Sequence, residues 1–100
     1  MIANAVRSLE LAVAHRLRAA MKAFGINPYP EMAGICGATA SVVGNWMSGL
    51  NLPRVPEMTL LCVRTGLTLD WIYRGTAVSM DPKLVLALSK PIDGKADAAE

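Results

Sequence analysis

Residues 31–49 contain two short helical segments joined by a glycine turn, and this pattern restricts the fold more than any other feature of the chain. Met32 and Cys36 lie four positions apart, as they would on one apolar face of a helix. Gly37 follows, and glycine readily adopts the left-handed conformation in which many helices end. Thr39 then offers a hydroxyl that can accept from a backbone amide and start a second helix.

The second segment, residues 40–48, is predicted to be a helix that Gly49 ends. We expect Val43, together with Trp46 or Met47, to face inward. Each segment thus has one apolar side, which indicates that the pair packs against the rest of the chain.

The flanking sequence predicts four more helices, no strand and no internal repeat. Before Gly25, apolar residues recur every three or four positions, which is typical of one long amphipathic helix. These residues are Ile2, Val6, Leu9, Val13, Leu17, Met21 and Phe24. Pro56 at a first turn and Gly66 after the segment predict a helix over residues 57–65. Thr68 as a cap and Gly75 as an end predict another over 69–74, and an Asp-Pro start predicts a third over 83–90.

The composition favours one small folded domain. The chain has 100 residues, of which 53% are hydrophobic and 18% charged, so a disordered chain is excluded. So much apolar sequence leaves surface that self-association could cover. The formal net charge is only +2, but basic residues exceed acidic ones over residues 1–24, which is compatible with an anionic partner.

Several protein classes are not expected. No apolar run approaches the roughly 18 residues that span a bilayer, and charged residues interrupt any signal-peptide core, so we predict a cytoplasmic protein. Cys36 and Cys62 have no CxxC spacing and the chain has one histidine, which predicts buried, inert thiols without a metal or a disulfide framework. No nucleophile has an evident base and no phosphate-binding loop is present, so neither an enzyme nor a cofactor is expected.

From about residue 13 to residue 75, the chain resembles the Cro/C1-type (XRE-like) helix-turn-helix family of phage repressors and small bacterial transcriptional regulators. The matching positions are Ala33 at the helix crossing, Gly37 at the turn, Val43 and Trp46 inside the second helix, and Gly49 at its end. Residues 66–75 resemble the last core helix of the family with the string Gly-Leu-Thr-Leu-Asp-Trp-Ile-Tyr-Arg-Gly.

The resemblance implies an all-α fold, namely a compact five-helix lambda-repressor-like DNA-binding domain with an additional C-terminal helix. Residues 1–78 would form this domain, with the motif at 29–49. Residues 79–90 would form the C-terminal helix, and residues 91–100 a flexible tail. We expect dimerisation through Leu84, Val85 and Leu88, or alternatively a sixth helix that covers the core of its own chain.

The resemblance also implies which residues read DNA bases, because in this family the first half of the second helix enters the major groove. The corresponding residues are Thr39, Ala40, Ser41, Val42, Gly44 and Asn45. Asn45 is the best single candidate, since its amide can pair with adenine through two hydrogen bonds. This face has no arginine, lysine or glutamine, so two-bond recognition of guanine is not expected.

Phosphate contacts are implied at the two sides of this helix. The candidates are Tyr29, Ser48, Asn51 and Arg54, with weaker contributions from Arg18 and Lys22. Tyr29, between two prolines, stands where the family usually has a glutamine. Such contacts determine position and salt dependence, whereas base contacts determine sequence preference.

The sequence therefore predicts a sequence-specific regulator of transcription that binds double-stranded DNA, most simply as a homodimeric repressor on a pseudo-palindromic operator. A different class remains open, namely an antitoxin-like or other protein-interaction module with the same fold and a protein partner. The chain has no room for a separate peptidase or ligand domain, so neither self-cleavage nor inducer binding is expected.

Overall fold

The computed structural model describes the backbone of residues 2–89 and the side chains of residues 7–27 and 29–89. Within this part the chain is all-helical, which confirms the predicted fold class. The elements are α1 (Ile2–Phe24), a π-helical turn (Pro28–Met32), α2 (Ala33–Cys36), α3 (Ala40–Met47), α4 (Val55–Thr65), α5 (Leu69–Arg74) and α6 (Pro82–Leu88). The predicted tail, 91–100, lies outside the described residues, as do Lys90 and the side chains of Ile2 and Val6.

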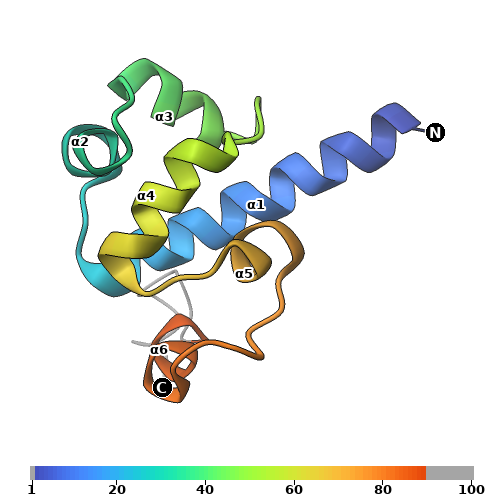
Figure 1. Cartoon of the computed structure of the whole chain (residues 1–100). Coiled ribbons are helices and arrows are strands. Elements are labelled where there is room, and N and C mark those ends of the chain that lie inside the picture. Colours follow the sequence, from blue (N-terminus) through green and yellow to red (C-terminus); the bar gives the residue numbers. More distant parts are fainter. Residues whose placement is uncertain (1, 90–100) are drawn as a thin grey trace, which may run out of the picture.

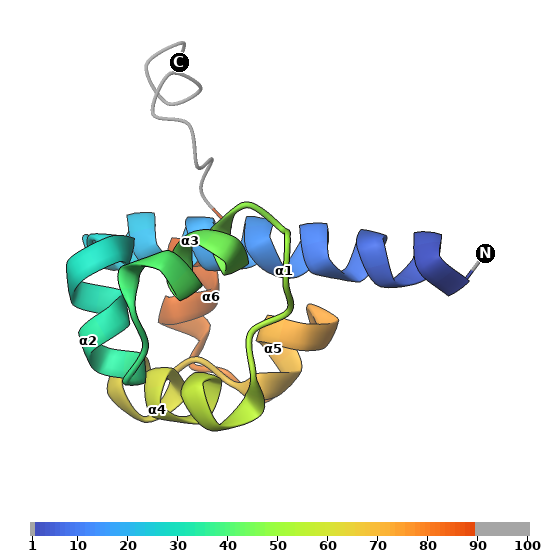
Figure 2. The ribbon, with the colours of Figure 1, turned by 90° about the horizontal axis from the view of Figure 1, so that it is seen from above.

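α1 is the longest helix, and the others gather around its carboxyl-terminal half (Figure 1). Its amino-terminal half extends past them, as the view from above also shows (Figure 2). This projection explains one departure from the predicted apolar stripe, because Leu9 is 38% exposed whereas Val13 and Leu17 are fully buried. No helix of residues 2–89 is both long enough and apolar enough to cross a membrane.

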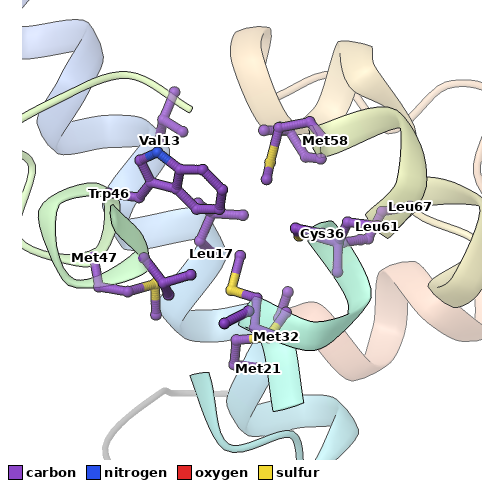
Figure 3. Packing of buried hydrophobic residues seen from close by; sticks show 14 of the residues in the cluster. Val13, Leu17, Met21, Met32, Cys36, Trp46, Met47, Met58, Leu61 and Leu67 are labelled. Carbon is purple, nitrogen blue, oxygen red and sulfur yellow. The ribbon is translucent and has the colours of Figure 1, made fainter. Parts of the chain in front are cut away.

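One hydrophobic core joins α1 to the short helices (Figure 3). The stripe on α1 meets side chains from every other helix except α6, whose contribution is only partly buried. Buried residues of the core include Leu17, Met21, Met32, Cys36, Val43, Trp46, Met47, Met58, Leu61 and Ile72. The predicted inward face of α3 is confirmed, and both Trp46 and Met47 belong to it.

Local capping explains where the helices begin and end. Thr39 Oγ1 accepts from Val42 N at 3.2 Å, and Thr68 Oγ1 accepts from Trp71 N at 3.1 Å. Gly37 ends α2 in the left-handed region with φ 68°. Pro56 lies in the first turn of α4, as predicted, but α4 begins at Val55, two residues before the predicted start.

The start of the second helix differs from the single continuous helix that the sequence predicts. Because Pro28 and Pro30 have no N–H, the amides of Glu31 and Met32 both reach Asn27 O, at 3.1 and 3.2 Å, and form a π-helical turn. Asn27 Oδ1 also accepts from Tyr29 N at 3.1 Å. This turn places the side chain of Tyr29 at the surface, beside α3.

α6 packs on its own chain. Leu84, Val85 and Leu88 are partly buried against the core, and α6 contacts α1. These contacts favour the alternative in which a sixth helix covers its own core, whereas Leu86 on the same helix is 67% exposed. Dimerisation through the three partly buried residues stays a prediction. The start of α6 is one residue earlier than predicted, at Pro82, since Asp81 Oδ1 accepts from Lys83 N.

Two glycines of the helix-turn-helix region are expected to respond to alanine with opposite signs. At Gly44, inside α3, an added Cβ would lie 3.6 Å from Tyr29 Cε1, an ordinary contact. Gly44→Ala is therefore expected to raise the free energy of unfolding by up to about 1 kcal/mol, through helix propensity. At Gly49, φ is 77° and a Cβ would lie 2.7 Å from Leu11 Cδ2. Gly49→Ala is expected to lower it by about 1–2 kcal/mol.

Urea denaturation of the two variants measures both effects. Gly37→Ala is the matched control, because φ is 68° there but nothing lies within 4 Å of the added Cβ. It should lose stability through backbone strain alone, and less than Gly49→Ala. A stabilised Gly49→Ala protein would contradict this account of the close approach between α1 and the end of α3.

Candidate nucleic-acid interface

The first turn of α3 forms the outer surface of the helix-turn-helix. Ala40, Ser41 and Val42 are exposed, and so is Thr39, which caps the helix. The buried residues of α3 are Val43, Trp46 and Met47, so the fully exposed residues among those predicted to read bases belong to its cap and first turn. Gly44 and Asn45, one turn further on, are only partly exposed.

Asn45 also organises the segment that follows α3. Its backbone carbonyl accepts from Leu50 N at 2.9 Å, from Asn51 N at 3.3 Å and from Ser48 Oγ at 3.2 Å. These bonds fold the chain back directly after the helix and hold Ser48 and Asn51, two predicted phosphate contacts, close to it. The sequence predicts a role for the Asn45 amide, but not this role for its carbonyl.

An open groove of about 450 Å³ lies between the end of α1, the π-helical turn and α3. Its lining residues are Arg18, Met21, Lys22, Ile26, Tyr29, Gly44, Met47 and Ser48. Four of the six predicted phosphate contacts are among these lining residues, and all four side chains are exposed: Arg18, Lys22, Tyr29 and Ser48. The structure therefore brings together side chains that come from three separate parts of the sequence.

The other two predicted phosphate contacts, Asn51 and Arg54, are exposed in the loop after α3 and do not line this groove. Arg54 Nε lies 4.0 Å from Glu57 Oε1, and the Arg54 side chain is 77% exposed, so this ion pair is weak. Tyr73 on α5 anchors the loop, because its hydroxyl donates to Pro53 O at 2.7 Å. The sequence gives no sign of this anchor, since the two residues are 20 positions apart.

Arginines of α1 hold the ends of two other helices. Arg18 Nη1 donates to Met47 O and Arg7 Nη1 donates to Gly49 O, both at the end of α3. Arg16 Nη1 donates to Ile72 O of α5 at 3.0 Å. α3 has no basic residue in its own last turn, so distant arginines supply donors to its terminal carbonyls. Arg7 and Arg18 are thus exposed and also have structural partners.

The two thiols occupy different environments. Cys36 is buried, as predicted, whereas Cys62 is only partly buried, and both are free. Burial raises the pKa of the Cys36 thiol from 9.0 to about 11, and the nearby Glu57 and Cys62 act in the same direction. Burial also raises the pKa of the Cys62 thiol. Among the described side chains, no three His, Cys, Asp or Glu residues lie together as a metal site requires.

The raised pKa of Cys36 predicts a loss of stability at alkaline pH. In the unfolded chain this thiol ionises near pH 9.0, but in the folded protein only near pH 11. As the pH rises, the thiol loses its proton in the unfolded chain before it does so in the folded protein, and this favours unfolding. The free energy of unfolding should therefore fall as the pH rises from about 9 to about 11. Urea denaturation at several pH values measures this fall. Cys36→Ala should show a shallower one, and an equally steep fall in both proteins would contradict the assignment.

Comparison with known proteins identifies no family for this chain. No protein-family model matches it, and searches of curated proteins and of solved structures give no match.

Proposed function

We propose that this protein is a sequence-specific regulator that binds double-stranded DNA with α3 in the major groove. The observation that supports this proposal is the groove that gathers Arg18, Lys22, Tyr29 and Ser48 beside the exposed first turn of α3. This separation of uncharged residues on α3 from cations and hydroxyls in the groove suits DNA. The uncharged side chains can contact base edges while the flanking cations and hydroxyls contact phosphates.

The dimensions also suit DNA. The major groove of B-DNA is about 12 Å wide and admits one α-helix with its exposed side chains. Ala40 and Val42 can pack against thymine methyl groups, and Ser41 can donate to or accept from a base edge. Lys22 lines the groove beside α3 and Arg54 is exposed in the loop after it, so the two cations are proposed to contact phosphates that flank the inserted helix.

As a regulator, the protein is proposed to act in the cytoplasm as a homodimeric repressor that occupies a promoter. Dimers with this motif place two reading helices about one DNA turn apart, roughly 34 Å, and thus prefer pseudo-palindromic sites. Because Leu84, Val85 and Leu88 are partly used by their own core, a dimer contact at α6 would include Leu86, which is exposed.

Selection of bound fragments from genomic DNA with purified protein tests the proposal. We expect a preferred sequence at moderate salt, and Asn45→Ala should weaken discrimination at one base position by about 1–3 kcal/mol. Asn51→Ala is a matched control, since loss of a phosphate contact should weaken all sites equally. Equal binding of all fragments, together with unchanged preference in Asn45→Ala, would contradict the proposal.

A protein-interaction module, such as an antitoxin-like protein, is the alternative function. The observation that favours it is the outer face of α4, where Val63 is 82% and Leu60 is 50% exposed. A stable stoichiometric complex with a co-expressed protein, without DNA binding, would support the alternative. A homodimer that protects a DNA site from cleavage would count against it.

A further inference from the structure

The groove beside α3 has a feature that phosphate binding does not require. Besides its four polar or charged side chains, it is lined by Met21, Ile26 and Met47. Ile26 is partly exposed, and its amide donates to Met21 O at 2.9 Å, which fixes the turn after α1 as one wall of the groove. A phosphodiester would contact only the polar rim and leave this apolar part unused.

We propose that this groove binds a small amphipathic organic anion. Its carboxylate or phosphate head would lie between Arg18 and Lys22, and its apolar tail would lie along Ile26 toward Met21 and Met47. The ring of Tyr29, which is about half exposed, would cover the tail from the other side.

The charges of the groove select the anion. Arg18 and Lys22 are the charged residues among its described lining residues, and both are basic. A guanidinium has five N–H donors, so the bond from Arg18 to Met47 O leaves donors for a carboxylate or phosphate oxygen. The hydroxyls of Tyr29 and Ser48 are uncharged and can donate further hydrogen bonds to the anionic head group.

The size of the groove and its side chains suit an apolar tail. Its volume of about 450 Å³ lies within the range of roughly 300–1,000 Å³ that is usual for small-molecule sites. Met21 and Met47 are almost fully buried in the absence of ligand. Methionine is unbranched and polarisable, so these two side chains can readjust around a tail at low cost.

Such a ligand would also regulate DNA binding, and this part of the inference rests on the proposed function. The head group and a DNA phosphate would use the same residues, Arg18, Lys22, Tyr29 and Ser48. Ligand and DNA would therefore exclude each other, and each would weaken the affinity of the other. The sequence-based expectation of no inducer concerned a separate ligand domain, whereas this groove lies within the helical domain itself.

Calorimetric titration with decanoate below its micelle concentration tests the ligand site without DNA. We expect saturable 1:1 binding to the full chain, at least tenfold weaker binding of decanol, which has the tail without the charge, and weaker binding of inorganic phosphate, which has the charge without the tail. Lys22→Glu should weaken decanoate binding at least tenfold. Lys83→Glu, an equal charge change on α6, should not.

A second variant tests the tail site. Gly44→Met adds a side chain beside Tyr29 where a Cβ makes only ordinary contact, so the variant should fold and yet fill the groove. It should lose decanoate binding. No saturable binding of decanoate, equal binding of decanol, or unchanged affinity in Lys22→Glu and Gly44→Met would overturn the proposal.

Competition separates this inference from the proposed function. With a DNA fragment that the protein selects, decanoate should raise the apparent Kd for DNA, and decanol, which lacks the charge, should leave it unchanged at the same concentration. DNA binding that decanoate leaves unchanged would overturn the regulatory part. Decanoate binding by a protein that binds no DNA would support the ligand site and contradict only the proposed function.

Discussion

The double variant Lys22→Glu/Arg54→Glu is expected to bind DNA about 100-fold more weakly than the unmodified protein at about 0.1 M salt. Both residues are exposed, one at the end of α1 and the other in the loop after α3. Each contact between a cation and a phosphate releases close to one counterion, so losing one costs about tenfold in affinity at this salt concentration. Reversal of the charge adds repulsion.

Fluorescence anisotropy with a selected DNA fragment over a range of salt concentrations measures this effect. The slope of log K against log salt should become shallower by about 2, and the preferred sequence should not change. The matched control is Arg74→Glu/Lys83→Glu, which makes the same change in net charge on the exposed surfaces of α5 and α6. If the control loses as much affinity, the attraction is general and Lys22 and Arg54 are not specific phosphate contacts.

Leu17→Ala is expected to lower the free energy of unfolding by about 2–5 kcal/mol. Leu17 is fully buried in the carboxyl-terminal half of α1, where its side chain lies close to Trp46 and Met32 (Figure 3). Truncation removes apolar contacts and leaves a cavity that the short surrounding helices can fill only in part. Because domains of this size are stable by only about 5–15 kcal/mol, much of the protein would unfold on mild heating.

Urea denaturation followed by circular dichroism measures the loss from the shift of the midpoint. Leu86→Ala is the matched control, because it makes the same change at a side chain that is 67% exposed, and it should shift stability by no more than about 0.5 kcal/mol. Equal losses in both variants would mean that α1 does not hold the core together as described.

Local chemistry made most of the fold predictable. Thr39, Thr68 and Gly37 act within three or four residues of their own positions, and each lies where the sequence predicts a helix end. The π-helical turn was not predictable in the same way. Pro28 and Pro30 have no N–H to donate, and the amide of Tyr29 donates to the Asn27 side chain, so the amides of Glu31 and Met32 both reach Asn27 O. The spacing of apolar residues contains no information about these bonds.

The candidate interface was only partly predictable. A resemblance to a known family supplied the residues of α3 and its flanks, but nothing in their spacing shows that Arg18 and Tyr29 line one groove. The apolar stripe of α1 likewise predicts Leu9 to be as buried as Val13. It is not, because burial depends on where the other helices end and not on periodicity.

The sequence by itself determined the helices, most of their ends and the apolar side of α3, because caps and amphipathic spacing act between residues a few positions apart. Only the tertiary structure decided what α1 does at the interface. Arg7 and Arg18 donate to carbonyls that are 42 and 29 residues away, and Lys22 reaches the same groove as Tyr29 and Ser48. Contacts over such separations form only when the whole core packs α1 against α3, so no local pattern contains them.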